Sequence, residues 1–244
     1  GDRIIQIAGH RASHATAPAV HLSRYEIAEI LSQHLKREVP PVPEEEMQAV
    51  RSDIESYLQK AKIGITGANA ISAKEGAALI LHNEGNITRV RIREKHILIT
   101  AIDKIFPKIE DALLMLRLET FLATGALFPS FIDILAGRSK SSDIEKQLFY
   151  GMHKPEEVII VFLDNGRRQI LNTSKDFSDL LYCIGCGNCL LDCPVYNTVG
   201  PFFGADGMLG GRGVALSCLL KGVREGVEDG LFLCTTCGLC GEVC

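Results

Sequence analysis

The stretch LYCIGCGNCLLDCPVYN, residues 181–197, holds four cysteines within eleven positions and a proline directly after the last one. Its spacing is Cys183-x2-Cys186-x2-Cys189-x3-Cys193-Pro194, and the last residues of the chain repeat it as Cys234-x2-Cys237-x2-Cys240-x3-Cys244. Two-residue gaps let three thiolates of one tight loop converge on three irons of a 4Fe-4S cube, while a fourth cysteine farther along ligates the neighbouring cluster. The two runs therefore predict two [4Fe-4S] clusters.

Each predicted cluster takes three cysteines from one run and one from the other. The first set is Cys183, Cys186, Cys189 and Cys244, and the second set is Cys193, Cys234, Cys237 and Cys240. Such cross-ligation predicts that the two runs fold together as one small helical module.

Other uses of cysteine fit the pattern less well. All nine cysteines lie between residues 183 and 244, whereas disulfide frameworks are usually found in short secreted chains with cysteines spread along their length. A pair of zinc sites is the alternative metal interpretation, but zinc knuckles pair two cysteines with two and rarely use runs of four. The ninth cysteine, Cys218, stands among apolar residues outside both runs and is expected to act as a small buried hydrophobe.

Composition excludes several classes of function. The chain has 244 residues, 46% of them hydrophobic, and 26 Lys and Arg residues against 30 Asp and Glu residues. The basic residues are scattered, which argues against a nucleic-acid surface. The most apolar run, 126–136, is short and contains Pro129 and Asp133, so no membrane span is expected. The first residues lack the order of a signal peptide, and a reducing, cytoplasmic setting is expected.

The first part of the chain alternates between helical and strand patterns. Ser23 and Glu26 have capping-box spacing and predict a helix; a stiff linker at 40–43 ends it, and a second helix is expected from Glu44. Later segments predict four strands, at 63–65, 77–81, 96–100 and 158–163, and helices at 107–122 and 214–223. We expect an α/β domain with a parallel or mixed sheet over residues 1–175, followed by a small α-helical two-cluster domain over residues 176–244.

Polar and glycine residues follow each predicted strand. In open α/β sheets ligands bind beyond the carboxyl ends of the strands, so these four ends together predict a pocket for a substrate or small cofactor. The candidate pocket residues are Gly67, Asn69, Asn83, Asn86, Asp164 and Asn165. Within it, Arg167 is a candidate for pairing with a substrate carboxylate, and Glu84 is a candidate base. Ordinary turn chemistry explains the same residues without a site, and Glu84 then caps a helix or forms a salt bridge.

Two further features of the sequence are candidate binding sites. The glycine-rich segment 204–213 lacks a preceding strand and the Gly-Lys-Ser/Thr ending of a phosphate loop, so we do not expect nucleotide binding there. His10, His14 and His21 are close in sequence and are candidates for ligands or acid-base groups. We prefer to interpret them as capping or surface residues because their spacing fits no helix face.

Several stretches beyond the cysteine runs carry a family resemblance. They are IIQIAGHRASHATAPAVH at 4–21, ITGANAISAKEGAALILHNEGN at 65–86, AIDKIFPKIEDA at 101–112 and VIIVFLDNGR at 158–167. With both cysteine runs, they resemble the lactate-utilisation iron-sulfur proteins of the LutB type. These proteins join a LUD domain, a Rossmann-like fold similar to sugar isomerases and CoA transferases, to an α-helical ferredoxin domain. Family members extend further at both ends, which implies that the sequence is part of a longer protein.

The resemblance implies an iron-sulfur subunit of a multi-subunit, NAD-independent L-lactate or 2-hydroxyacid dehydrogenase. Its expected partners are other redox subunits, of heterodisulfide-reductase or flavoprotein type, with a flavin carried on a partner. Membrane association at the inner face through such partners is also compatible with it. The alternative is an electron-transfer adaptor in which the LUD domain is a non-catalytic platform. A weaker third interpretation is a structural or redox-sensing metalloprotein.

Overall fold

The computed structural model describes residues 1–14, 17–83, 85–173 and 175–244. Contacts divide these residues into two compact units: unit 1 joins residues 1–57 to residues 169–244, and unit 2 holds residues 58–168. The units follow contacts in space, whereas the predicted domain ranges, 1–175 and 176–244, follow the order of the chain. Those ranges stay a prediction.

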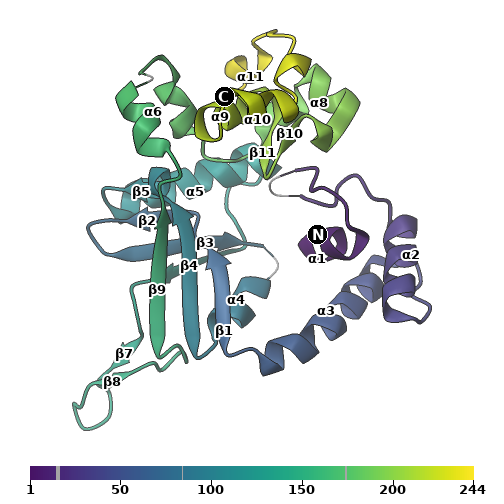
Figure 1. Ribbon diagram of the computed structural model, residues 1–244. Coiled ribbons are helices and arrows are strands. Elements are labelled where there is room, and N and C mark those ends of the chain that lie inside the picture. Colours follow the sequence, from purple (N-terminus) through teal and green to yellow (C-terminus); the bar gives the residue numbers. More distant parts are fainter. Residues whose placement is uncertain (15–16, 84, 174) are drawn as a thin grey trace. The chain divides into compact units, whose positions relative to one another are not determined.

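Unit 2 is built mainly from strands (Figure 1). Its strands are β1 (Ile63–Gly67), β2 (Ala70–Ser72), β3 (Ala77–His82), β4 (Lys95–Ala101), β5 (Ile105–Phe106), β6 (Phe131–Leu135), β7 (Lys140–Ser141), β8 (Phe149–Tyr150) and β9 (Glu157–Leu163). Its helices are α4 (Asn86–Arg91), the 3-10 turn η1 (Ile102–Lys104) and α5 (Ile109–Thr124). The four strands and the helix expected in this region are all present, each within a few residues of its predicted bounds.

These strands form two main sheets where the sequence suggested one. Strands β1, β4 and β9 make a parallel sheet in the order β1-β4-β9, and a second, mixed sheet has the order β5-β2-β3-β6. Only a short turn joins β2 to β3, and a connection of that length permits antiparallel pairing but no parallel crossover. Strand β3 is therefore outside the parallel sheet, and the four predicted strand ends do not share one sheet edge.

The core of unit 2 lies between the two sheets. Leu98 of β4 contributes from the parallel sheet, and Ile71, Ile80 and Leu135 contribute from the mixed sheet. Leu98 and Ile80 are almost completely buried. Burying such aliphatic side chains stabilises the fold by roughly 1.5–3 kcal/mol each.

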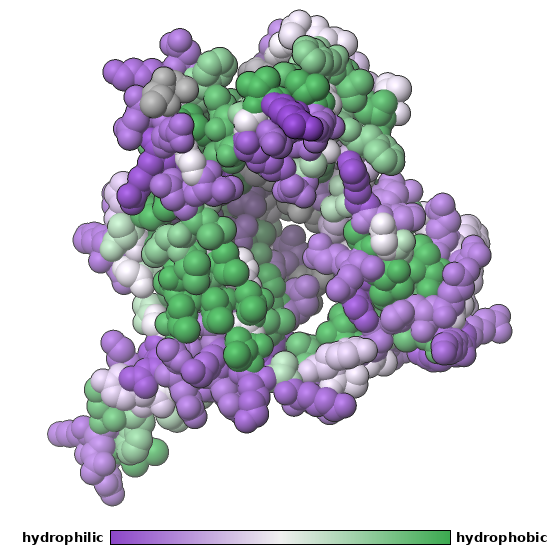
Figure 2. All heavy atoms as spheres, in the orientation of Figure 1, coloured by the Kyte–Doolittle hydropathy of each residue, from purple (hydrophilic) through white to green (hydrophobic). Residues whose placement is uncertain are grey.

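The other face of the parallel sheet carries exposed aliphatic side chains. Alternate residues along β1 are buried and exposed, as expected where successive side chains point to opposite faces. The exposed residues are Ile63, Ile65, Ile99, Ile159 and Val161. Figure 2 shows a hydrophobic area over these strands.

Unit 1 is mainly helical. Its first segment contains α1 (Asp2–Ala8), α2 (Arg24–Leu35) and most of α3 (Pro43–Lys60). Its second segment contains most of α6 (Arg167–Thr173), then η2 (Lys175–Tyr182), α7 (Asn188–Leu191), α8 (Pro194–Val199), η3 (Gly200–Phe202), the hairpin β10 (Gly204–Ala205) and β11 (Met208–Leu209), α9 (Gly210–Leu220), α10 (Val223–Glu228), η4 (Leu231–Leu233) and α11 (Leu239–Glu242). The predicted helix at 214–223 is α9, which begins four residues earlier.

The predicted capping box is present at the start of α2. The Ser23 hydroxyl accepts a hydrogen bond from the Glu26 backbone at 3.3 Å, and the Glu26 carboxylate accepts one from the Ser23 backbone at 2.8 Å. This exchange satisfies two backbone donors that a helix start leaves free. Leu31 of α2 is then fully buried with Val39 and Ala49, which packs α2 against α3.

A separate core forms in the second segment of unit 1. Phe203 and Val214 are fully buried, and Leu190 and Tyr196 pack with them. Cys189, Cys193 and Cys234 contact this same core. The apolar packing therefore fixes the backbone on which both cysteine runs are mounted.

Gly64 of β1 provides a test of the packing in unit 2. A Cβ atom at this position would overlap the carbonyl oxygen of Val90 in α4 and lie 2.9 Å from its carbonyl carbon. We expect Gly64→Ala to lower the free energy of unfolding by about 1–3 kcal/mol, measured by chemical denaturation followed by circular dichroism. Gly67→Ala in the same strand is the control, because its Cβ would lie 3.9 Å from the nearest atom. Equal losses of unfolding free energy in Gly64→Ala and Gly67→Ala would contradict the close packing of α4 on β1 at Gly64.

Candidate metal centre

The first cysteine run is a loop between two short helical elements. Cys183 follows η2, and the backbone is left-handed at Gly185 (φ 84°) and Gly187 (φ 79°), on either side of Cys186. Glycine adopts this conformation without steric cost, so the loop bends twice within three residues. Helix α7 then carries Cys189, and Cys193 caps α8 by accepting a hydrogen bond from the Tyr196 backbone at 3.4 Å.

The second run repeats this local structure. Cys234 follows η4, Cys237 lies between the left-handed residues Thr236 (φ 53°) and Gly238 (φ 83°), and Cys240 lies in α11. The repeated spacing in the sequence therefore corresponds to a repeated backbone path. In each run a tight loop presents three thiols on one side.

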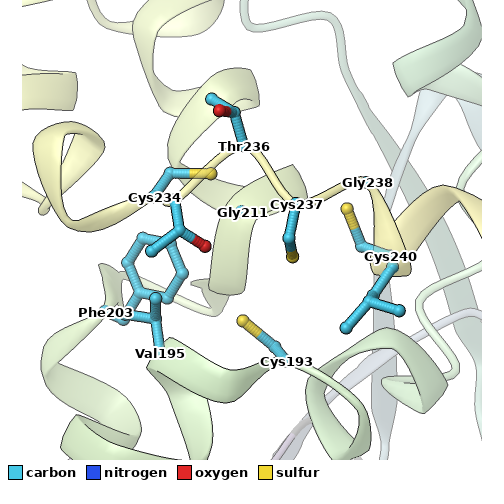
Figure 3. Close-up of a pocket in the computed structure, with 11 residues that line it drawn as sticks. Cys193, Val195, Phe203, Gly211, Cys234, Thr236, Cys237, Gly238 and Cys240 are labelled. Carbon is cyan, nitrogen blue, oxygen red and sulfur yellow. The ribbon is translucent and has the colours of Figure 1, made fainter.

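Cys193 joins the cysteines of the other run. A cavity of about 210 Å³ is lined by Cys193 together with Cys234, Cys237 and Cys240. Figure 3 shows these four side chains arranged around it. These are the four residues that the sequence assigns to the second cluster, and a single set of four thiols around one cavity is the donor set that a 4Fe-4S cube needs.

Gly211 of α9 forms part of the wall of this cavity. A Cβ atom built there would lie 3.5 Å from the Cys234 sulfur and 4.0 Å from the Cys240 sulfur. A larger side chain would extend further into the space between the thiols. The absence of a side chain at residue 211 therefore keeps the cavity open.

Cys183, Cys186 and Cys189 of the first run also lie close together. The pKa of Cys189 is raised to about 11, first by burial and then by the neighbouring Cys183, Cys186 and Cys240. Thiolates repel one another at short range, and this repulsion together with burial keeps the Cys189 thiol protonated near neutral pH. A bound metal would displace that proton and neutralise the thiolate charge.

The last residues of the chain return to the first run. The Asn188 side-chain amide of α7 donates to the Val243 carbonyl at 3.1 Å. This bond anchors the residue next to Cys244 beside the helix that carries Cys189, and the first set stays a prediction. Among the described residues, no group of three or more His, Cys, Asp or Glu side chains is arranged around a single metal ion. A single ion needs ligands converging on one point, whereas a cube receives one thiolate at each of four irons.

Cys218 lies apart from both sets. Its side chain meets Gly226 of α10 so closely that a Cβ at residue 226 would overlap the sulfur. Burial is the largest cause of the raised pKa of this thiol. It packs at the contact between α9 and α10 but is only half-buried, less than predicted.

One of the three early histidines lies beside the first run. His14 is buried, and a Cβ at Gly187 would lie 2.6 Å from its Cε1 atom. The neighbouring Ser13 carbonyl accepts a hydrogen bond from the Tyr196 hydroxyl of α8. His10 and His21 instead contact each other, and His21 also lies 2.8 Å from the Ser13 hydroxyl. The surface interpretation is therefore wrong for His14, because a tertiary contact about 170 residues away in sequence buries it, and sequence spacing carries no signal of that contact.

In unit 2, the described residues of the predicted pocket make structural contacts. Arg167 donates to Asp103 at 2.8 Å and to the Asp164 carbonyl at 3.2 Å. Asp164 in turn accepts from the Arg168 backbone at 2.9 Å at the start of α6. The guanidinium is thus paired with a carboxylate of the protein itself.

The remaining candidates are divided between strand ends. Asn69 donates to Glu119 at 3.1 Å and accepts from the Leu81 backbone at 3.0 Å, while Asn83 accepts from the Ser130 backbone at 2.9 Å. Asn86 accepts from the Ile87 backbone at 2.9 Å, Asn165 has a left-handed backbone (φ 45°), and Gly67 ends β1. Glu84 lies outside the described residues.

The predictions from the sequence did not include Glu119. It is only 8% exposed, and burial is the main cause of its raised pKa. The buried residues of α5 are Ala112, Met115, Leu116, Glu119 and Thr120, which follow helical periodicity. A carboxyl group in an apolar stripe was therefore a detectable signal.

Two family models match the chain. Residues 2–163 match the LUD domain, and residues 179–244 match the 4Fe-4S dicluster domain. Among curated proteins, the chain is 30% identical over 245 residues to the uncharacterized electron transport protein YkgF of Escherichia coli (strain K12), covering 100% of the chain and 49% of that protein. It is 31% identical over 246 residues to lactate utilization protein B of Bacillus subtilis (strain 168), with 100% and 49% covered.

Identity to lactate utilization protein B of Geobacillus sp. (strain WCH70) is 32% over 246 residues, covering 100% of the chain and 50% of that protein. The chain spans about half the length of the curated relatives it matches. The search of solved structures found no match.

Gly211 allows a test of the second cysteine set. We expect Gly211→Val to place methyl groups between the thiols of Cys234 and Cys240 and to lower the iron content from about eight to about four atoms per chain. Anaerobic iron and sulfide analysis measures this loss. Gly241→Val is the control, because a Cβ there meets no atom within 4 Å. Full iron content in the Gly211 variant would show that no cluster fills the cavity.

Glu119 gives a pH-dependent prediction. Because its folded-state pKa is raised, its contribution to stability is present below the unfolded-state pKa and is lost as pH rises through the folded-state pKa. We expect Glu119→Gln to have a higher free energy of unfolding than the parent protein near neutral pH, with no gain below about pH 4.3. Denaturation across this pH range tests it. The control is Glu110→Gln, at an exposed residue of the same helix, and it should not raise the free energy of unfolding. A lower free energy of unfolding for Glu119→Gln than for the parent protein at neutral pH would refute the prediction.

Proposed function

The chain belongs to the LUD-domain family, with a 4Fe-4S dicluster domain after the LUD domain, and we propose that it forms the iron-sulfur part of an NAD-independent L-lactate or 2-hydroxyacid dehydrogenase complex. In this role it passes electrons one at a time between a two-electron centre and an acceptor. The observation that carries the proposal is the cavity shared by Cys193 and three cysteines of the second run.

The two cysteine sets would hold the clusters. Cys183, Cys186, Cys189 and Cys244 hold the first, and Cys193, Cys234, Cys237 and Cys240 hold the second. When bound, each cube supplies a centre that accepts and releases a single electron. The apolar core around Phe203 and Val214 supports both loops and keeps water from one side of them. Cys193 connects the sets, because it is the last cysteine of the first run and faces thiols of the second.

The substrate class rests on the relatives and on electron counting. Oxidation of a 2-hydroxyacid to a 2-oxoacid releases two electrons and two protons, so a chain of one-electron carriers needs a two-electron centre before it. The Bacillus subtilis and Geobacillus relatives are named lactate utilization protein B, and the Escherichia coli relative is named an electron transport protein. We place the two-electron centre, a flavin, on a partner subunit of flavoprotein or heterodisulfide-reductase type.

The contacts of Arg167 favour the adaptor alternative for the LUD domain. A guanidinium that binds a substrate carboxylate needs free donors in a fork, but the Arg167 Nε group is already bonded to Asp103. Asn69, Asn83 and Asp164 are likewise bonded to protein groups. In this alternative the LUD domain is a docking platform for redox partners and catalyses no step itself.

The proposal includes the location of the protein in the cell. In the described ranges, no helix is both long enough and apolar enough to cross a membrane. We propose a cytoplasmic protein that reaches the inner face of the membrane only through its partners.

The experiment is anaerobic purification of the full-length protein with its native partners, followed by electron paramagnetic resonance after addition of L-lactate without NAD. We expect lactate to reduce the clusters in the complex, while the protein alone is reduced only by dithionite. Cys193→Ser should lower the iron content by about half and abolish reduction by lactate. Cys218→Ser is the matched control and should keep both. A complex that dithionite reduces but lactate does not would refute the lactate assignment, and lactate reduction of the protein without partners would refute the adaptor alternative.

A further inference from the structure

Arg212 has a buried donor without a partner. It lies near the start of α9, and its Nη2 atom donates to the Leu180 carbonyl at 3.3 Å, just before the first cysteine run. Its Nε atom is buried and has no hydrogen-bond partner among the described residues. Buried N–H groups are nearly always satisfied in folded proteins, so an orphan points to a group that completes the site.

The guanidinium acts on the first thiol set. Its Nη2 hydrogen bond to the Leu180 carbonyl holds the group three residues before Cys183, the first thiol of this set. No carboxylate in the described part of the chain forms an ion pair with Arg212. Arginine remains charged at any relevant pH, and Arg212 is half-buried, so solvent screens its charge only in part. Arg212 therefore supplies a fixed, unneutralised positive charge beside the first run.

Resting on the proposed function, we infer that Arg212 tunes the cluster held by Cys183, Cys186, Cys189 and Cys244 by donating its Nε–H to one of the cluster's sulfur atoms. Hydrogen bonds to sulfur and nearby charge are two of the factors that set the potential of an iron-sulfur cluster. Reduction adds one electron and makes the cluster more negative by one charge, with no bond broken. A nearby cation and an N–H donor both stabilise that added charge.

This arrangement makes the two clusters unequal. The second set has Gly211 beside it, which brings no charge and no donor side chain, whereas the first set has Arg212. Adjacent residues at the start of one helix thus serve different purposes at the two sites. Arg212 therefore makes the first cluster more easily reduced than it would be beside an uncharged side chain without a donor.

The test is an anaerobic redox titration of the full-length protein with dithionite, followed by electron paramagnetic resonance. In Arg212→Met, which keeps a side chain of similar length without charge or donor, we expect about a tenfold loss in the one-electron reduction equilibrium constant of the first cluster, equal to a potential lower by about 59 mV. The second cluster should change much less. The Cys186→Ser variant identifies which of the two signals belongs to the first cluster.

Further variants distinguish an effect of Arg212 on the reduction potential from a purely structural role of this residue. Arg212→Lys keeps the charge, and its first-cluster reduction potential should fall between those of Arg212→Met and the parent protein. A purely structural role of Arg212 would instead alter the iron content or the melting temperature and leave the potential unchanged. Arg224→Met, at an exposed arginine paired with Glu228, is the matched control and should shift neither potential. An unchanged first potential in Arg212→Met with full iron content overturns the inference.

If Arg212→Met does not assemble, Arg212→Lys and Arg212→Gln decide, and parent-like potentials in both overturn the inference. A parent protein without two clusters would instead overturn the proposed function.

Discussion

The cysteine-bearing segment depends on one constraint, the convergence of Cys193 with three thiols from a run that begins 41 residues later. To satisfy it, the chain between Cys193 and Cys234 must fold back on itself, and α8, the β10–β11 hairpin, α9 and α10 do so around Phe203 and Val214. Such a short segment buries little apolar surface, and small folds of this kind usually need cross-links. Four thiols around one cavity provide that cross-link once metal is bound, so folding and cluster binding stabilise each other.

Close backbone approach recurs at both compact units, and glycine makes it possible. Gly64 lets α4 lie directly on β1, and Gly226 makes room for the Cys218 sulfur between α9 and α10. Gly211 has a different effect, because the space it leaves faces the thiols and not a neighbouring backbone. The same residue type therefore tightens packing at two positions and keeps a cavity open at a third.

Polar groups are used differently in the two units. In unit 2 the predicted pocket residues are bonded to protein partners: Arg167 to Asp103, Asn83 to the Ser130 backbone and Asn69 to the Leu81 backbone. These bonds hold strand ends and loops. In unit 1 the Arg212 Nε–H is buried without a partner beside a cysteine run. The crowded thiols and this unpaired donor lie together in unit 1, and that placement supports locating the chemistry there.

Local sequence determined much of this protein. The cysteine spacing indicated two four-thiol sets, the Ser23 capping box marked the start of α2, and short apolar runs gave the strands β1, β3, β4 and β9. These features depend on residues close together in the chain, where spacing and backbone preference suffice. The periodicity of α5 also contained the signal for Glu119, although it was not recognised.

Only the tertiary structure decided which distant groups meet. It separated β3 from the parallel sheet, paired Arg167 with Asp103, buried His14 against Gly187 and left the Arg212 Nε–H without a partner. Each of these outcomes depends on packing between segments tens of residues apart. Sequence spacing carries no information about such distances, because the free energy of burial is set by whichever surfaces the folded chain brings together.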